Sequence, residues 1–322
     1  MRAVVCDQLG PPSDLRIEER PDLDAGPGQV VVDVTAADLT HVDALFITGA
    51  YQIKPPTPFV PGTQAAGVVS AVGEGCDGVA VGDRVITAAG LGAYATQIAI
   101  GPQQLLPIPD SMSDEVAAGF IQAYATAWFA FTRRLHLHDG ESLLVTGASG
   151  GVGRAAVDLG SAMGAVVIAG ASTHERLDEA ASAGATHLVN YAEVELTPTV
   201  RELVPVGIDV VYDPVGGEIG WNAYRTLGSL GRYGVVGFVG GIGSLPTNRI
   251  LLGNRSALGI DWGHWAGGHP EQNQDMLRDL LAFAGEGRLS PPTPGRVRFD
   301  DVAEALQAFL DRNVTGKLAL VV

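Results

Sequence analysis

The chain has 322 residues, enough for two domains that each bury a sizeable core. Hydrophobic residues make up 46% of it and charged residues 17%, a composition typical of globular proteins. With 36 acidic and 20 basic residues, the formal net charge is -16, and long-range repulsion disfavours nucleic acids and anionic membranes as partners. Two cysteines, Cys6 and Cys76, are too few for a disulfide framework or a four-cysteine zinc lobe, so nothing points to an oxidising compartment.

Two stretches bear on targeting and membrane insertion. At the N-terminus, charges at Arg2 and Asp7 interrupt the chain before a signal-peptide core can form. Residues 116–132 carry no charge and approach the lower length limit of a membrane-spanning helix, but polar side chains such as Gln122 and Tyr124 interrupt them. We therefore predict a buried helix at 116–132, no membrane association and a cytoplasmic protein.

Residues 1 to about 120 contain short strand patterns that are broken by glycine and proline. Alternation over residues 30–35 predicts a strand, and residues 67–73 and 81–85 predict two strands around a turn. Long helical periodicity is scarce in this part of the chain. The pattern predicts a compact β-rich domain that is not doubly wound.

From about residue 121 to residue 262, strand and helix patterns alternate. After a first strand that ends near Gly147 and the helix that follows it, the patterns predict strands at 165–171, 187–191, 208–213, 231–239 and 257–262, and helices at 174–183, near 199–204 and at 217–227. Alternation of this kind predicts a parallel sheet with helices on both faces. The tail from residue 274 carries two helical patterns, the second at 301–310, and a short terminal strand, and is predicted to fold back onto the first domain.

The first strand, turn and helix of this series, residues 142–159, contain the spacing Ala148-x-Gly150-x-x-Gly153. Gly150 allows the backbone to approach a pyrophosphate, and Gly153 allows the helix to pack closely on its strand. The anion then meets unpaired N–H groups at the positive end of the helix. A glycine-rich turn that binds nothing is the alternative, but the flanking strand, the helix and the second strand favour a dinucleotide site.

The end of the second predicted strand distinguishes between the two nicotinamide cofactors. A site that prefers NAD has Asp or Glu about twenty residues after the glycines, whereas small and hydroxyl residues follow the strand here. Ser172 can donate to a 2′-phosphate, and Arg176 can offer a planar fork to its oxygens. The sequence therefore predicts NADPH. The alternatives are that Arg176 is a solvated residue paired with a neighbouring acid, or that Glu175 folds back onto the ribose.

Motifs spread over nearly the whole chain resemble the medium-chain dehydrogenase/reductase superfamily, and within it the zinc-independent, zeta-crystallin-like quinone oxidoreductase family. The matching segments are Pro61–Val69, Val81–Val85, Thr126–Trp128, Ala148–Gly153, Asn190–Tyr191, Tyr212–Gly217, Val236–Phe238 and Gly316–Lys317. The resemblance implies an α/β fold with a Rossmann doubly wound parallel sheet over residues 121–262. It also implies a split, β-rich GroES-like catalytic domain, residues 1–120 and 263–322, with the active site in the cleft between the two domains.

The resemblance also implies a set of cofactor-binding residues, namely Thr126, Ser149, Gly150, Gly151, Val152, Ser172, Arg176, Tyr191, Gly237, Phe238, Val239 and Lys317. Thr126 would lie against the nicotinamide, residues 149–152 against the pyrophosphate, and residues 237–239 against the carboxamide through their backbone. Ser172, Arg176 and Tyr191 would surround the adenosine 2′-phosphate, although a tyrosine that ends a strand can also serve only in packing. Lys317 would make a late contact near the cofactor.

The chain departs from its zinc-dependent relatives at the metal positions. Zinc-dependent alcohol dehydrogenases of the superfamily have a cysteine in the segment held here by residues 38–40 and a histidine where Thr63 stands. His41 and Asp43 are ligand-type residues nearby, but a catalytic zinc needs about three protein ligands. We expect no metal site.

Without a metal, the easier reaction is hydride delivery from NADPH to a quinone or an α,β-unsaturated carbonyl, in which the developing negative charge is delocalised. Thr40, Tyr51 and Thr126 are the candidate catalytic residues, although the family usually has Asn where Thr40 stands and Glu where Gln64 stands. One alternative is an enoyl-thioester reductase of a biosynthetic pathway, which would need a basic rim from Arg232, Arg249 and Arg255. The other is a non-catalytic NADP(H)-binding sensor. A homodimer is expected from the resemblance.

Overall fold

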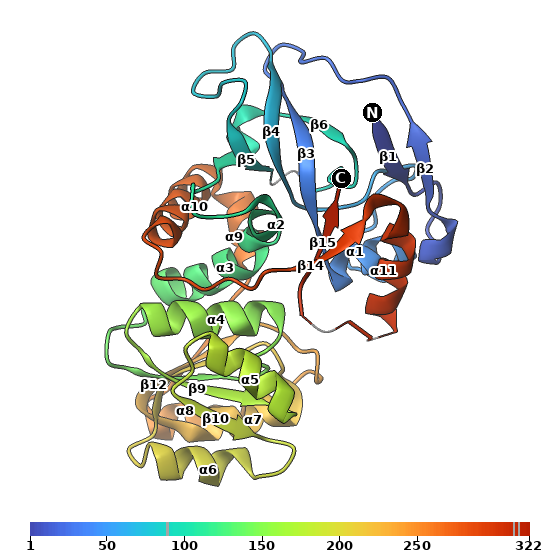
Figure 1. Cartoon of the computed structure of the whole chain (residues 1–322). Coiled ribbons are helices and arrows are strands. Elements are labelled where there is room, and N and C mark those ends of the chain that lie inside the picture. Colours follow the sequence, from blue (N-terminus) through green and yellow to red (C-terminus); the bar gives the residue numbers. More distant parts are fainter. Residues whose placement is uncertain (88–89, 312, 315) are drawn as a thin grey trace. The chain divides into compact units, whose positions relative to one another are not determined.

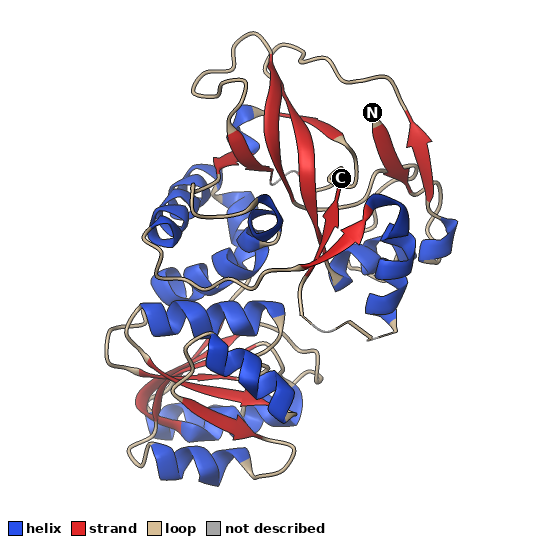
Figure 2. Cartoon of the chain, viewed as in Figure 1, coloured by secondary structure: helices blue, strands red, loops and turns tan. Residues whose placement is uncertain are grey.

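The computed structural model describes residues 1–87, 90–311, 313–314 and 316–322 (Figure 1). They form two compact units, one made of residues 1–120 and 292–322, the other of residues 121–291. The predicted fold class is confirmed, since a parallel sheet lies in the second unit and a separate, mainly antiparallel sheet in the first (Figure 2). Residues 263–291, which the sequence analysis assigned to the catalytic domain, lie in the second compact unit. The division into functional domains remains a prediction.

The first unit is built around a seven-stranded sheet with the order β14-β15-β3-β4-β5-β7, in which β6 also pairs with β3. A separate pair, β1 with β2, completes the strands. The bounds are β1 Arg2–Val5, β2 Arg16–Glu19, β3 Val30–Leu39, β4 Ala65–Val72, β5 Arg84–Thr87, β6 Gln97–Ile100, β7 Leu105–Pro107, β14 Gly295–Arg298 and β15 Leu318–Val321. Its α-helices are α1 His41–Thr48, α2 Asp114–Ala118 and α11 Val302–Leu310, with short 3-10 turns at Pro12–Asp14, Pro102–Gln104 and Phe299–Asp301.

Close approach of β3 and β4 explains why small residues recur in both strands. A Cβ on Gly67 would lie 2.2 Å from the Asp33 carbonyl oxygen, so this position of β4 admits only glycine. The terminal strand β15 runs antiparallel to β3, with Leu318 opposite Leu39. The predicted return of the C-terminus to the first part of the chain is therefore observed for residues 295–321.

The second unit contains a six-stranded parallel sheet with the order β10-β9-β8-β11-β12-β13. The strands are β8 Ser142–Val145, β9 Val166–Ala171, β10 His187–Asn190, β11 Ile208–Asp213, β12 Leu227–Val235 and β13 Ser256–Gly259. The helices are α3 Phe120–Phe129, a π-helical turn Ala130–Arg134, α4 Gly151–Ala162, α5 His174–Ser182, α6 Leu196–Leu203, α7 Gly217–Thr226, α8 Thr247–Gly253, α9 Trp262–Gly268 and α10 Pro270–Gly285. In Figure 1, α4 and α5 cover one face of this sheet and α6, α7 and α8 the other.

The order of the strands reverses between β8 and β11. In open parallel sheets of this kind, ligands bind outside the carboxyl ends of the strands at such a switch point. The glycine-rich turn follows β8, and the turn that begins at Pro214 follows β11. The fold therefore brings both turns to the edge of the sheet where a ligand is expected.

Several predicted elements differ from the structure in their bounds. The strand predicted at 231–239 is β12 at Leu227–Val235, because pairing with β11 brings Leu227 opposite Ile208 although glycines dilute the apolar pattern there. The strand predicted at 257–262 ends at Gly259, and the Asp261 side chain caps α9 by accepting a hydrogen bond from the His264 N–H at 3.0 Å. The single buried helix predicted at 116–132 is divided at Gly119 between α2 and α3.

No helix within the described part of the chain is long and apolar enough to span a membrane. Side chains of residues 120–131 are mostly buried, which accounts for the absence of charge in this stretch. Three helices were not predicted at all, α1, α8 and α9, and each is eight residues or shorter. Segments this short provide too few turns for a periodicity to stand out.

Candidate active site

The glycine-rich turn after β8 leads directly into the N-terminus of α4. Gly147 has a φ of +55°, and a Cβ on Gly153 would lie 2.2 Å from its carbonyl oxygen. A Cβ on Gly150 would meet only that oxygen, at 3.4 Å, and one on Gly151 would meet nothing within 4 Å. Packing therefore requires glycine at 153, whereas positions 150 and 151 face space that the protein itself does not fill.

The first turn of α4 supplies donors to that space. Gly150 is the N-cap residue and its own N–H donates to the Gly147 carbonyl at 3.0 Å. The N–H groups of residues 151–153 begin the helix and have no intrahelical acceptor. Together with the helix dipole they suit an anion such as a pyrophosphate. Ser149 and Val152, predicted to line the same region, are half-buried beside them.

Asp213, at the end of β11, organises the neighbouring turn, a role that sequence reasoning missed. Its carboxylate is 0% exposed and accepts hydrogen bonds from the hydroxyls of Thr146 and Tyr233. It also accepts the N–H groups of Val215 at 3.0 Å and Gly216 at 3.1 Å. The ends of β8, β11 and β12 are thereby fixed to one carboxylate. The available signal was an acidic residue that ends a buried apolar strand and precedes Pro-Val-Gly-Gly.

The segment predicted to contact the carboxamide, Gly237–Val239, lies in the loop after β12. A Cβ on Gly237 would lie 2.6 Å from the Pro214 carbonyl oxygen, and the Gly240 N–H donates to the Val215 carbonyl at 2.8 Å. The loop is therefore packed backbone to backbone on the turn that Asp213 holds. The side chains of Phe238 and Val239 are exposed, by 57% and 89%, which leaves backbone groups as the fixed feature of this segment.

Ser172, Arg176 and Tyr191 come together beyond the end of β9. Arg176 Nη1 donates to Ser172 Oγ at 3.1 Å, and Thr173 caps α5 by accepting from the Arg176 N–H. The Tyr191 ring packs beside Gly170, and burial raises the pKa of its hydroxyl while the nearby Arg176 charge lowers it. Arg176 forms no ion pair with any described carboxylate, so its charge is available to a ligand.

Thr126, the predicted nicotinamide contact, lies in α3 of the second unit. Its hydroxyl donates to the Gln122 carbonyl at 2.7 Å, one helical turn earlier. The proton of this hydroxyl is thus already used in a hydrogen bond within the helix, and only the oxygen can still accept a hydrogen bond. Thr126 can position a donor group of a ligand, but it is not set up to donate a proton.

Thr40 and Asp43 form a capping box at the start of α1 in the first unit. Thr40 Oγ1 donates to Asp43 Oδ2 at 2.5 Å and accepts from the Asp43 N–H at 3.2 Å. Asp43 is 1% exposed, its Oδ1 has no hydrogen-bond partner among the described residues, and burial raises its pKa to about 6. Thr40, predicted as a catalytic residue, therefore fixes the start of a helix.

Lys317, predicted to lie near the cofactor, forms an ion pair inside the first unit. Its Nζ lies 2.8 Å from both carboxylate oxygens of Asp38, which is 1% exposed. The Tyr94 hydroxyl donates to the Asp38 carbonyl at 3.1 Å, and a Cβ on Gly119 would come within 2.9 Å of the Asp38 carboxylate. The lysine charge is thus balanced by a buried partner, and the lysine side chain keeps 21% exposure.

Tyr51 and Gln64 complete the predicted residues of the first unit. The Tyr51 ring lies 4.7 Å from the Phe46 ring, tilted by 48°, and its N–H donates to the Leu45 carbonyl just after α1. Gln64 is buried immediately before β4. Beside it, Thr63 Oγ1 is buried with no hydrogen-bond partner among the described residues.

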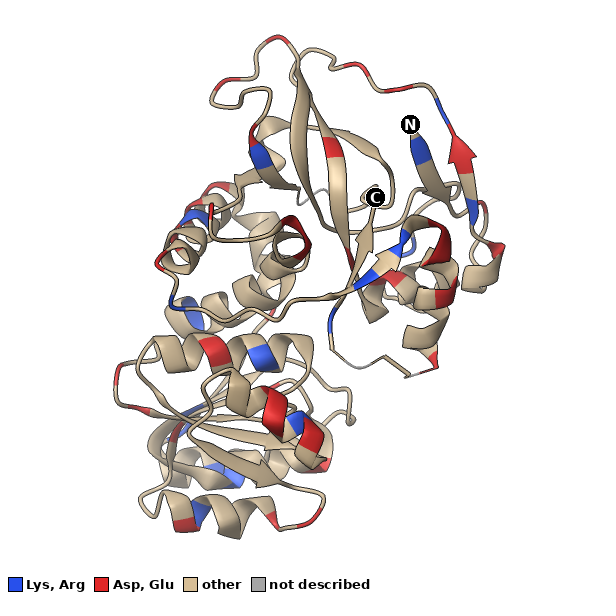
Figure 3. Ribbon diagram, viewed as in Figure 1, with Lys and Arg blue, Asp and Glu red and all other residues tan. Residues whose placement is uncertain are grey.

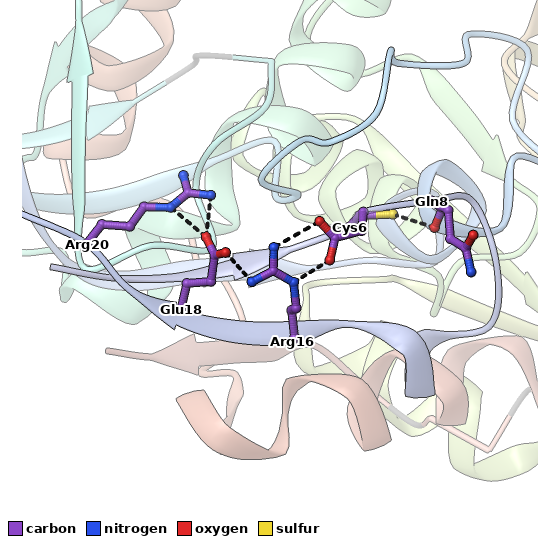
Figure 4. Close-up of polar contacts among 6 residues, drawn as sticks. Cys6, Gln8, Arg16, Glu18 and Arg20 are labelled. Atoms are coloured by element: carbon purple, nitrogen blue, oxygen red, sulfur yellow. Dashed lines mark hydrogen bonds and ion pairs between the residues drawn. The ribbon is translucent and has the colours of Figure 1, made fainter.

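The side chains near these positions do not fit a catalytic zinc. Across the described ranges, no three His, Cys, Asp or Glu side chains gather into a group that could hold a metal ion. Cys6 is held elsewhere in the first unit, where its thiol donates to the Gln8 carbonyl at 3.2 Å beside an exposed network of Arg16 with acidic neighbours (Figure 4). Burial raises the pKa of the Cys6 thiol, which disfavours the thiolate that a metal would need.

The buried Asp43 makes a pH-dependent contribution to stability. Its folded-state pKa of about 6 lies above the ordinary value of 3.8, mainly through desolvation and partly through the charge of Asp38. The stabilisation is therefore full below pH 3.8 and is lost as the pH rises through 6. We expect Asp43→Asn to gain about 2 kcal/mol over the wild type between pH 4 and pH 8, measured by urea unfolding at each pH. Parallel stability profiles for the two proteins would contradict this.

Two family models match successive parts of the chain. A family model described as alcohol dehydrogenase GroES-like domain matches residues 26–110, and one described as zinc-binding dehydrogenase matches residues 151–282. Quinone oxidoreductase-like protein 2 of Rattus norvegicus is 36% identical over 328 residues, which cover 99% of this chain and 91% of the relative.

Solved structures show the same fold over the full length. A probable oxidoreductase from Mycobacterium abscessus is 36% identical, with a TM-score of 0.87 and coverage of 100% of this chain and 99% of that one. A mycobacterial protein complexed with NADPH is 26% identical, with a TM-score of 0.85 and full coverage of both chains. The chain therefore belongs to the quinone oxidoreductase-like family of the medium-chain dehydrogenase/reductase superfamily, a family of oxidoreductases.

Proposed function

We propose that this oxidoreductase uses NADPH to reduce a quinone or an α,β-unsaturated carbonyl without zinc. The observation that carries the cofactor assignment is the hydrogen bond from Arg176 to Ser172 at the end of β9, where a site for NAD has a carboxylate. The mycobacterial relative solved with NADPH supports the same assignment. The described residues include no group of side chains that could hold a metal ion, which supports an acceptor that delocalises its own negative charge.

Several groups of this chain would hold the cofactor. The N–H groups at the start of α4 would bind the pyrophosphate, and Ser172, Arg176 and Tyr191 would bind the 2′-phosphate. Backbone groups of residues 237–239 would orient the carboxamide, on a loop that the Asp213 turn keeps rigid. The bound nicotinamide would supply the hydride.

The roles of the remaining predicted residues follow from their bonding. Thr126 has only an acceptor free, so it would orient the nicotinamide rather than transfer a proton. Thr40 and Tyr51 would contact the acceptor molecule. Lys317 would act close to the cofactor while Asp38 holds its ammonium group in place.

We further propose that the protein is a cytoplasmic homodimer, with residues 1–120 and 263–322 as catalytic domain and 121–262 as cofactor domain. Support for a dimer comes from β13, which is an edge strand of the parallel sheet. The helix before it, α8, exposes Leu251 and Leu252. An open strand edge beside exposed apolar side chains is a surface that proteins usually cover.

The cofactor assignment can be tested by titrating NADPH and NADH into the metal-free protein and following tryptophan fluorescence. NADPH is expected to bind more tightly than NADH. Arg176→Gln is expected to lower the affinity for NADPH by about 10- to 100-fold, because it removes a charge-assisted hydrogen bond to phosphate. NADH, which lacks the 2′-phosphate, should bind both proteins equally. Tighter binding of NADH to the wild type would contradict the assignment and point to Glu175.

The reaction is tested by adding 9,10-phenanthrenequinone or a simple enone to the NADPH-loaded protein and following cofactor absorbance. Oxidation on addition of either acceptor is expected. Turnover with enoyl thioesters alone would favour the enoyl-thioester reductase. Tight binding of NADPH without turnover on any acceptor would favour the NADP(H)-binding sensor.

A further inference from the structure

A pocket in the second unit lies among α6, α7 and α8. It has a volume of about 520 Å³ and is lined by Arg201, Arg225, Arg249 and Arg255. Arg225 lies near the end of α7, before β12 begins, and Arg255 directly precedes β13. The pocket therefore lies toward the amino ends of the strands, whereas the glycine-rich turn lies at their carboxyl ends. Figure 3 shows how thinly basic residues are spread over the rest of this acidic chain.

Two of the four arginines have a structural role. Arg201 donates to the Arg225 carbonyl at 2.9 Å, and Arg255 donates to the carbonyls of Tyr224 and Leu227. These carbonyls belong to the last turn of α7 or follow it, where backbone acceptors lack helical partners and a positive charge is favourable. Arg255 also lies 5.3 Å above the centre of the Tyr224 ring. Helix capping thus accounts for Arg201 and Arg255.

Capping does not account for Arg225 and Arg249. Both side chains are exposed, and neither has a hydrogen bond or an ion pair with the residues that the structure describes. Glu195 is the one acidic residue among the described residues that line the pocket. Four guanidinium groups facing a single carboxylate repel one another, in a chain whose formal charge is -16. A bound anion would remove this repulsion.

The floor of the pocket is aromatic. Trp221, Tyr224 and Arg225 follow each other at helical spacing on one side of α7, and the two rings stack at 5.8 Å with an interplanar angle of 13°. Trp221 stays half-exposed, so it presents a planar surface to the pocket. The Tyr224 hydroxyl is buried and has no hydrogen-bond partner among the described residues.

We propose that this pocket binds a nucleotide with two or more phosphate groups, at a site separate from the cofactor. Arginine forks match phosphate oxygens, and a half-buried tryptophan ring that lines the pocket offers a base a surface for stacking. The volume falls within the range of about 300–1,000 Å³ that is usual for sites of small molecules. Arg225 and Arg249 would bind the phosphates, since their donors are otherwise unused, and Trp221 would bind the base.

The test is calorimetric titration of ADP into the protein saturated with NADPH, so that the cofactor site is already filled. Saturable binding of ADP is expected, and Arg225→Gln and Arg249→Gln are each expected to weaken it about tenfold, because each removes one charge-assisted interaction. Arg278→Gln is the control, since it removes one exposed positive charge on α10, outside the pocket. Glu195→Gln should raise the affinity for ADP about threefold, because it removes a negative charge that repels the phosphates.

Inorganic pyrophosphate separates the contribution of the base from that of the phosphates. It is expected to bind the same pocket at least tenfold more weakly than ADP, because it cannot stack on Trp221. Equal affinity for pyrophosphate and ADP would overturn the nucleotide assignment. The proposed site would be overturned if ADP showed no saturable binding, or if Arg225→Gln and Arg249→Gln bound ADP as tightly as the wild type does. If NADPH does not bind, the same variants still report on this pocket, because both arginines lie outside the proposed cofactor site.

Discussion

Replacing Asp213 by alanine is expected to lower the free energy of unfolding by about 3–5 kcal/mol, the range seen when one partner of a buried charged network is removed. The carboxylate is fully buried and accepts hydrogen bonds from two hydroxyls, of Thr146 and Tyr233, and from two backbone N–H groups. Alanine leaves all four donors without a partner in a site closed to water, and each unsatisfied donor is costly. Guanidinium unfolding followed by circular dichroism measures the change.

The matched control for this change is Asp178→Ala. Asp178 is also in the second unit, but it is exposed on α5, where a surface substitution is expected to change the free energy of unfolding by no more than about 0.5 kcal/mol. Because the Asp213 turn supports the loop at 237–241, the folded Asp213→Ala protein should also bind NADPH more weakly than the wild type does. An effect of Asp213→Ala on stability no larger than that of Asp178→Ala would show that this carboxylate does not hold the turn.

Alanine at the two fingerprint glycines of the α4 turn is expected to give opposite patterns of stability and binding. In Gly153→Ala the new Cβ would lie 2.2 Å from the Gly147 carbonyl oxygen, so the backbone must shift, at a cost of about 2–3 kcal/mol in unfolding free energy. In Gly150→Ala the new Cβ meets only that oxygen, at 3.4 Å, and φ is an ordinary -68°. Stability should therefore change little in Gly150→Ala, while NADPH affinity falls at least about tenfold, because the methyl group occupies the space proposed for the pyrophosphate.

Unfolding by urea and fluorescence titration with NADPH on both variants separate the two roles. Gly151→Ala is the control for the backbone, since its Cβ has open space and alanine at the first position of a helix should gain about 0.5 kcal/mol in stability. If Gly150→Ala bound NADPH as tightly as the wild type does, the pyrophosphate would not bind at this turn. A Gly153→Ala protein as stable as the wild type would show that the turn can relax around the added methyl group.

The outline of the fold was predictable because its signals are local. Alternating strand and helix patterns over residues 121–262 predicted the parallel sheet, and the strand predicted at 208–213 has the same bounds as β11. Motif spacing predicted the family, which the comparisons confirm. The predicted pairing of Ser172 with Arg176 at one phosphate is compatible with their hydrogen bond, because both lie within one turn of the start of α5.

The bounds of elements were predicted wrongly where contacts with neighbouring segments, and not the local sequence pattern, set them. β12 begins four residues earlier than its apolar pattern indicates, since a strand lying between β11 and β13 is set by the hydrogen bonds of its neighbours. The residues proposed for the carboxamide moved with it, from the end of a strand into a loop. The strand predicted at 257–262 ends early, and α9 begins at Trp262, because Asp261 caps a helix there.

The sequence by itself determined the alternation of strands and helices over residues 121–262, the glycine-rich turn after β8, and the lack of a cysteine at residues 38–40 and of a histidine at residue 63, because each depends on neighbours along the chain. Only the tertiary structure decided which charges are partnered. Lys317 and Asp38 are 279 positions apart, yet they form an ion pair in which the aspartate is buried. Asp213 accepts hydrogen bonds from Thr146 after β8, from Tyr233 in β12 and from the turn after β11. The four arginines of the pocket among α6, α7 and α8 come from α6, from α8, from the end of α7 and from the residue before β13. Such groupings depend on how distant segments pack, which no local pattern encodes.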